Sequence, residues 1–275
     1  MHWKPQKLGS PELDTPLVAL AFADLDGDGK PELYAVTARE VIALAVGEHR
    51  VREIGRVPFA GERRVAAPRD VVGAAIADGG VLVASVSTYA ARLRVSWRGK
   101  TLVGEPAGAG FALCPGERAV LLAAGRDHVG SGPSAYYTLR CREMLDPQAR
   151  TLKVRATLSV AGRLDINAQA CGASGCEPAG HHELGNVGYA FDVADFDRDG
   201  APEVIYAAAS APGDPDTIKV VTWDGDEKKP LYRKDWKADG VAAIVVGDLD
   251  GTGAPVAIAA VRIPGETRVD LWRLN

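Results

Sequence analysis

The sequence predicts an all-β fold built from repeated four-stranded antiparallel sheets that close into a ring. An acidic loop pattern recurs three times, as DLDGDGKPE at 24–32, DFDRDGAPE at 195–203 and DLDGTGAPV at 248–256. Each copy stands between two short runs of small apolar residues, which are typical of strands buried on both faces. The second and third copies begin at residues 195 and 248, so one unit spans roughly 55 residues.

The first unit reads as a four-stranded meander, and later parts of the chain repeat it. Its expected strands are 17–23, 33–37, 41–46 and 51–57. The fourth unit has expected strands at 189–194, 204–209, 218–223 and 231–236. The last unit starts at residue 241 and offers only three strands. We therefore expect the N-terminal strand, residues 3–8, to complete the last sheet, which would remove two exposed edges at once.

Two further units fit between the first and second acidic loops. Residues 74–85 and 111–125 are each expected to form two strands joined by a shortened loop, which lacks the acidic residues. The interval before the fourth unit is too long for one sheet, so residues from about 166 to 186 are expected to form a surface loop excursion. The full prediction is a single domain over 1–275, with units near 17–60, 71–105, 109–165, 187–237, and 241–275 plus 2–9.

Composition excludes several classes of protein. The 275-residue chain is 47% hydrophobic, which is ample for a packed core and argues against disorder. It carries 32 basic and 36 acidic residues, which give a net charge of −4. This charge balance does not indicate the basic surface of a nucleic-acid-binding protein. No apolar stretch reaches the roughly 18 residues of a membrane span. We expect a monomer without a membrane span.

The N-terminus and the cysteines bear on the compartment. MHWKPQKLG lacks the apolar region of a secretory signal, so the chain is either cytoplasmic or begins after a removed leader. Four cysteines, an even count beside acidic metal loops, favour disulfides and export to the periplasm, the cell envelope or the extracellular space.

The sequence allows more than one role for the four cysteines. Cys171 and Cys176 are expected to form a disulfide that pins the excursion. Cys114 and Cys141 either pair across neighbouring strands or are small core residues. The alternative for the excursion is a zinc site, with candidate ligands Cys171, Cys176, His181, His182 and Glu183.

The acidic loops place oxygen ligands for a hard cation at alternate positions. Calcium takes six to eight oxygens at about 2.3–2.6 Å. Side chains at positions one, three and five bring three oxygens to one point, position seven adds a backbone carbonyl, and position nine adds a carboxylate. The first loop offers Asp24, Asp26, Asp28, the Lys30 carbonyl and Glu32. The second offers Asp195, Asp197, Asp199, the Ala201 carbonyl and Glu203.

Charge repulsion argues that the first two loops hold Ca2+. Two carboxylates about 4 Å apart repel by roughly 4 kcal/mol at an effective dielectric constant near 20. The third loop offers only Asp248 and Asp250 with the Thr252 hydroxyl, so its site is expected to be weak or vacant. An EF-hand would need a glutamate at position twelve and flanking helices, and neither is present in the sequence. Acidic surface turns without a metal are the remaining alternative.

The repeated unit resembles the FG-GAP or VCBS repeat of integrin-type β-propellers. In both, the pattern D-x-D-x-D-G-x-P-E stands between two apolar strands. The copies at 24–32 and 195–203 match this pattern, whereas the copy at 248–256 departs from it at Thr252 and Val256. The resemblance covers the first, fourth and fifth units. It implies a β-propeller of five radial four-stranded blades, with calcium in the loop between the first two strands of a blade.

No nucleophile elbow, phosphate-binding glycine loop or Ser/His/Asp set is evident. The expected function is therefore a non-enzymatic, calcium-stabilised scaffold that binds a protein or glycan partner at the cell envelope or outside the cell. The alternative is a polysaccharide-acting enzyme, a lyase or glycosidase, with its site in the axial funnel. Propellers host many functions, so the fold alone does not distinguish a binding scaffold from an enzyme. The residues that line the axial funnel are the feature that distinguishes them.

Overall fold

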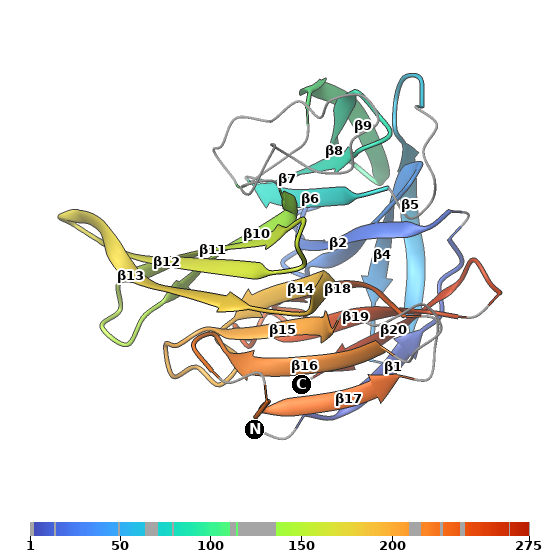
Figure 1. Cartoon of the computed structure of the whole chain (residues 1–275). Coiled ribbons are helices and arrows are strands. Elements are labelled where there is room, and N and C mark those ends of the chain that lie inside the picture. Colours follow the sequence, from blue (N-terminus) through green and yellow to red (C-terminus); the bar gives the residue numbers. More distant parts are fainter. Residues whose placement is uncertain are drawn as a thin grey trace.

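The computed structural model shows five four-stranded antiparallel sheets arranged as a five-bladed β-propeller (Figure 1), which confirms the predicted fold class. The structure describes residues 3–13, 15–48, 50–63, 71–78, 80–110, 114, 136–208, 216–225, 228–236, 240–263 and 265–274. Within these ranges, no helix has the length and apolar character to cross a membrane.

The first three blades are meanders whose strands follow one another in chain order. Blade 1 consists of β2 (Leu17–Ala23), β3 (Glu32–Thr37), β4 (Glu40–Val46) and β5 (Val51–Pro58). Blade 2 consists of β6 (Gly73–Asp78), β7 (Val81–Val86), β8 (Ala91–Arg98) and β9 (Thr101–Ala109). Blade 3 consists of β10 (Tyr136–Leu145), β11 (Thr151–Ser159), β12 (Leu164–Gly172) and β13 (Gly175–Leu184).

The last two blades differ in how their outer strand is supplied. Blade 4 consists of β14 (Val187–Ala194), β15 (Glu203–Ala208), β16 (Asp216–Thr222) and β17 (Tyr232–Trp236). Blade 5 consists of β18 (Val241–Gly247), β19 (Val256–Arg262), β20 (Val269–Leu274) and the N-terminal β1 (Pro5–Gly9). β1 pairs antiparallel with β20, with Pro5 opposite Leu274, so the expected completion of the last blade by the N-terminal strand is confirmed.

Trp3 fixes the N-terminal segment against the neighbouring blade. Its side chain is buried, and its ring centroid lies 4.7 Å from that of Phe196 and 5.6 Å from that of Tyr232, both in blade 4. Aromatic pairs at these distances add to the free energy gained from burial alone. The segment therefore completes blade 5 and also joins it to blade 4.

Neighbouring blades pack through their innermost strands. β2 contacts β6 and β18, and β14 contacts β10 and β18. β3 is buried along its whole length, as expected for a strand covered on both faces. Some of the contacts between blades have room only for a glycine. On the innermost strands, a Cβ on Gly73 would lie 2.4 Å from Val18 Cγ2, and one on Gly247 would lie 2.4 Å from Phe22 Cδ2. The small side chains of the inner strands thus allow blades to approach one another closely.

Blade 3 differs from the prediction. The prediction placed it at 109–165 and assigned 166–186 to a loop excursion, but the sheet covers Tyr136–Leu184 and the supposed excursion is the outer hairpin β12–β13. Leu164, Ile166 and Ala168 are buried and alternate with polar residues, which is the pattern of a strand covered on one face. Small residues and glycines concealed this alternation. The strands predicted within 111–125 lie outside the described residues, Cys114 excepted.

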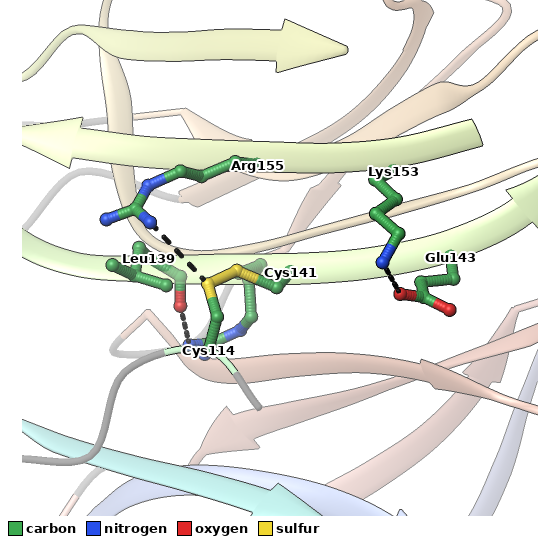
Figure 2. The surroundings of a disulfide bond; sticks show 7 residues. Cys114, Leu139, Cys141, Glu143, Lys153 and Arg155 are labelled. Atoms are coloured by element: carbon green, nitrogen blue, oxygen red, sulfur yellow. Dashed lines mark hydrogen bonds and ion pairs between the residues drawn. A yellow bond between two sulfur atoms is a disulfide. The ribbon is translucent and has the colours of Figure 1, made fainter. Parts of the chain in front are cut away.

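Two disulfides belong to blade 3. Cys171 and Cys176 pair directly across the end of the β12–β13 hairpin, which extends beyond the other blades (Figure 1). Figure 2 shows Cys114 bonded to Cys141 of β10, beside Arg155 of β11. Both predicted pairings are confirmed, and a zinc site that uses the two thiols of the hairpin is wrong because those sulfur atoms are bonded to each other. Two disulfides indicate an oxidising, exported environment.

Candidate metal centres

The three acidic loops gather at one end of the propeller. Each connects the innermost strand of a blade to the next: β2 to β3, β14 to β15, and β18 to β19. A Cβ on Gly251 would lie 3.8 Å from the Gly29 carbonyl oxygen, so the loops of blades 5 and 1 are neighbours. Asp195 of blade 4 and Asp248 of blade 5 line one cavity of 630 Å³. The loops therefore form one acidic surface around the mouth of the propeller.

The blade 1 loop brings its four predicted carboxylates together. Asp24, Asp26, Asp28 and Glu32 each offer an oxygen, and these oxygens all lie within 4.8 Å of one another. The turn is held by the loop itself, because the Gly27 and Gly29 amides donate to Asp24 Oδ1 and Oδ2 at 2.8 and 3.0 Å. The Lys30 amide donates to Asp28 Oδ1 at 2.8 Å, so Lys30 takes part in the same turn.

Glu32 is held in place by groups from two blades. Its Oε2 accepts the Tyr34 hydroxyl at 2.8 Å, and Tyr34 in turn accepts the Trp97 indole N–H from blade 2 at 2.9 Å. Burial raises the pKa of the Glu32 carboxyl above its ordinary value, and the nearby charges of Asp26 and Asp24 raise it further. A positive charge close to this buried carboxyl would favour its ionised form.

The blade 4 loop repeats this construction. Oxygens of Asp195, Asp197 and Asp199 lie within 4.8 Å of one another. The Gly200 amide donates to Asp195 Oδ2 at 2.9 Å, and the Ala201 amide donates to Asp199 Oδ1 at 2.8 Å. Thus the same residue positions make the same turn in two blades separated by much of the chain.

Glu203 is the buried carboxylate of the blade 4 loop. It is 1% exposed, and its Oε2 accepts the Phe196 amide at 2.7 Å. Burial raises the pKa of Glu203 to about 7, with further contributions from Asp197, Asp195 and Asp199. Its oxygens are not among those within 4.8 Å of all three aspartates, so three of the four predicted side-chain ligands are brought together here.

The blade 5 loop balances its charge differently. Thr252 donates its hydroxyl to Asp250 Oδ1 at 2.6 Å, and Arg273 Nη2 lies 3.7 Å from Asp250 Oδ2. Asp248 accepts the Gly253 amide at 2.7 Å and forms the same kind of turn as in the other loops. These contacts hold the pKa of Asp250 below its usual range, with the Thr252 hydroxyl as the largest cause. An arginine thus supplies positive charge where the acidic pattern is incomplete.

The first two loops contain no such compensation among the described residues. No lysine or arginine in those residues forms an ion pair with the aspartates of the blade 1 or blade 4 loop. The candidate metal ligands in these two loops are all oxygen atoms, and several of them are charged. This set suits a hard cation such as calcium. The residues present fit a divalent ion in both loops.

One loop residue has an unusual backbone conformation. Arg198 has φ of 61°, at the position where the other loops have Gly27 and Gly251 with φ of 76° and 72°. A residue with a Cβ is strained in this left-handed region, and such strain concentrates at functional sites. Arg198 lines the 630 Å³ cavity beside Asp195. Arg198 was not among the predicted site residues, although its departure from glycine is visible at the fourth position of the repeat.

An ion pair beneath the loops, between Asp192 and Arg142, was also not predicted from the sequence. Asp192 is fully buried on β14, and Arg142 of β10 donates to both of its oxygens. The amides of Val193 and Val246 donate to the same carboxylate at 2.9 and 2.7 Å, so Asp192 ties together blades 3, 4 and 5. A charged residue within the apolar run YAFDVA is the signal that could have identified it.

The buried glutamate gives a pH-dependent prediction for the metal-free protein. Because folding raises the pKa of Glu203 from 4.5 to about 7, its contribution to stability is present below pH 4.5 and is lost as the pH rises to about 7. In EDTA, we expect the Glu203→Gln variant to lose less stability than the wild type between pH 5 and pH 8, by about 2–3 kcal/mol. Urea unfolding at the two pH values measures this, and equal losses in both proteins would contradict it.

In comparisons with known proteins, no family model and no curated protein matches this chain.

Proposed function

We propose that this protein is a calcium-stabilised propeller scaffold that binds a protein or glycan partner, located in the periplasm, at the cell envelope or outside the cell. The main observation in support is the pair of loops in blades 1 and 4, each of which brings three or four carboxylates within 4.8 Å without a basic partner among the described residues. Millimolar calcium outside the cytosol agrees with the oxidised cysteines of the chain.

In this proposal, calcium acts as a structural staple. Each ion would hold the connection between the two innermost strands of its blade, and Glu32 and Glu203 begin the second of those strands. If such sites bind with Kd between 10⁻⁴ and 10⁻³ M, then 1 mM calcium stabilises the fold by roughly 0.4–1.4 kcal/mol per site. Rigid loops at the propeller mouth would then be presented to a partner.

A thermal melt tests the calcium sites. We expect 1 mM CaCl2 to raise the Tm of the wild type relative to EDTA, and equilibrium dialysis to find two ions per chain. The variant Asp26→Asn/Asp197→Asn keeps one acceptor oxygen at each position but removes two charges, so it should lose most of the shift.

The matched control is Asp250→Asn, in the loop that has Arg273 beside it. This variant should keep the calcium response of the wild type. Identical melting of the wild type in calcium and in EDTA would reject structural calcium, and so would a full response in the double variant.

The lining of the cavity favours binding over polysaccharide cleavage. None of the described residues that line the 630 Å³ cavity is aromatic. Its carboxylates outside the acidic loops, Glu143 and Asp146, form ion pairs with Lys153 and Arg150. Sugar-processing sites combine a suitably placed carboxyl pair with contacts to the sugar ring. A panel of acidic and neutral polysaccharides separates the two functions. Retention of a polysaccharide without new reducing ends supports a binding module, whereas release of new ends or of unsaturated products supports a lyase or glycosidase.

A further inference from the structure

The outer hairpin of blade 3 carries a second, chemically different group of potential ligands. Asp165 of β12 lies directly opposite Glu183 of β13, and Asn167 lies directly opposite His181. In a sheet, residues two apart share one face, and directly opposite residues have Cβ atoms about 4.5–5.5 Å apart. These four side chains therefore form a compact square on the face of the hairpin opposite to buried Ile166.

Three of these side chains converge. Asp165, His181 and Glu183 each offer a ligand atom, and these atoms lie within 4.8 Å of one another. His181 Nε2 is 3.4 Å from Asp165 Oδ2. Two ligands bonded at about 2.1 Å to a tetrahedral zinc ion are about 3.4 Å apart. The distance between His181 Nε2 and Asp165 Oδ2 is long for a hydrogen bond, but it matches the distance between two ligand atoms of one tetrahedral zinc ion.

Neighbouring side chains orient the two carboxylates. The Asn167 amide donates to Asp165 Oδ1, which leaves Oδ2 directed to His181. Arg163 Nη1 lies 3.5 Å from Glu183 Oε2, which leaves the other oxygen of that carboxylate available. Partners of this kind hold metal ligands in position and are nearly as important as the ligands themselves.

A simple ion pair does not account for the whole group. A pair between His181 and Asp165 needs only two residues, and the second carboxylate beside them adds repulsion that a divalent ion would remove. With neutral histidine, the two carboxylates and Arg163 sum to a single negative charge, which favours a cation. The Cys171–Cys176 disulfide at the hairpin end holds the two strands in register and takes no part as a ligand.

We propose that Asp165, His181 and Glu183 bind a divalent transition-metal ion of the zinc class on the exposed face of the β12–β13 hairpin. One nitrogen and two carboxylate oxygens are ligands that zinc accepts, whereas the calcium loops offer oxygen alone. Three protein ligands leave a fourth position for water or for a side chain of a bound partner. The site is independent of the calcium loops, because it shares no residue with them.

Isothermal titration with ZnCl2 tests this site in zinc-free, disulfide-intact protein at pH 7.5 with 1 mM CaCl2 present. We expect one zinc ion per chain, and at least tenfold weaker binding in His181→Ala and in Asp165→Asn. The matched control is His182→Ala, because His182 lies opposite Ile166 and points to the other face of the hairpin. It should bind zinc as the wild type does. Titration with Co²⁺ should give the visible absorption of a tetrahedral ion in the wild type and in His182→Ala only.

Three outcomes would overturn the proposal. They are the absence of zinc binding, equal affinity in the wild type and in His181→Ala, and loss of binding in Asp26→Asn/Asp197→Asn, which would assign the ion to the acidic loops. Near-native thermal melts of the histidine variants confirm that any loss reflects the missing ligand. Failure here leaves the calcium result unchanged, and failure of the calcium experiment leaves this one unchanged.

Discussion

Replacing Arg142 with methionine is expected to destabilise the protein by about 3–5 kcal/mol, because the fully buried carboxylate of Asp192 loses the guanidinium that donates to both of its oxygens. Methionine retains much of the apolar length of the arginine side chain, so the main loss is the charge. The effect should appear as a large fall in the urea midpoint, since Asp192 also accepts amides from blades 4 and 5.

Two comparisons isolate the cause of that loss. Arg98→Met removes an exposed partner of Glu105, with both side chains more than half exposed, and should cost less than about 1 kcal/mol. The double variant Arg142→Met/Asp192→Asn removes the buried charge but keeps an acceptor for the Val246 amide, so it should be more stable than Arg142→Met alone. If Arg142→Met were no worse than Arg98→Met, the ion pair would not hold the three blades together.

Loss of the Cys114–Cys141 disulfide is expected to have the second largest effect. The bond links residues 27 apart, and chain entropy alone gives about 3.5 kcal/mol for a closed loop of this size. The Cys171–Cys176 bond spans only 5 residues, and the same argument gives about 2 kcal/mol. Cys114→Ser/Cys141→Ser should therefore unfold at lower urea concentration than Cys171→Ser/Cys176→Ser. The reverse order would show that the hairpin end contributes more to stability than loop length predicts.

The repeat made most of the architecture predictable. Apolar runs beside each acidic loop identified the inner strands, because strands covered on both faces show no polar alternation. The N-terminal strand was predicted from its likeness to the outer strand of the fourth unit, and β1 takes in blade 5 the outer place that β17 takes in blade 4. A local pattern was sufficient wherever each blade repeats it.

Blade 3 was misplaced because it lacks the repeated loop. Its inner faces use alanine at positions such as Ala156, Ala168 and Ala170, which give a weak hydrophobic signal. Glycines and cysteines at the hairpin end then resembled a loop. Without the acidic marker, spacing alone placed the blade about 25 residues too early, roughly half of one repeat.

The long-range contacts of the sites could not be read from local sequence. Arg142 and Asp192 are 50 residues apart, and Arg273 of β20 lies beside Asp250 in the loop between β18 and β19. His181 and Glu183 were noticed as part of a cysteine and histidine site, but their third partner, Asp165, depends on the register of β12 and β13. Such pairs become visible only when the pairing of strands is known.

The position of β1 has a consequence for biosynthesis. Pro5 and Leu274 are partners although the strands β2 to β19 all lie between them in the sequence. Contacts this distant in sequence form slowly, and they require the C-terminal segment to have been synthesised. Until then the first strand has no neighbour, and its buried Leu8 remains accessible to proteases and to other unfolded chains. Although β1 is synthesised before the other strands of the propeller, it is thus among the last of them to reach its native place.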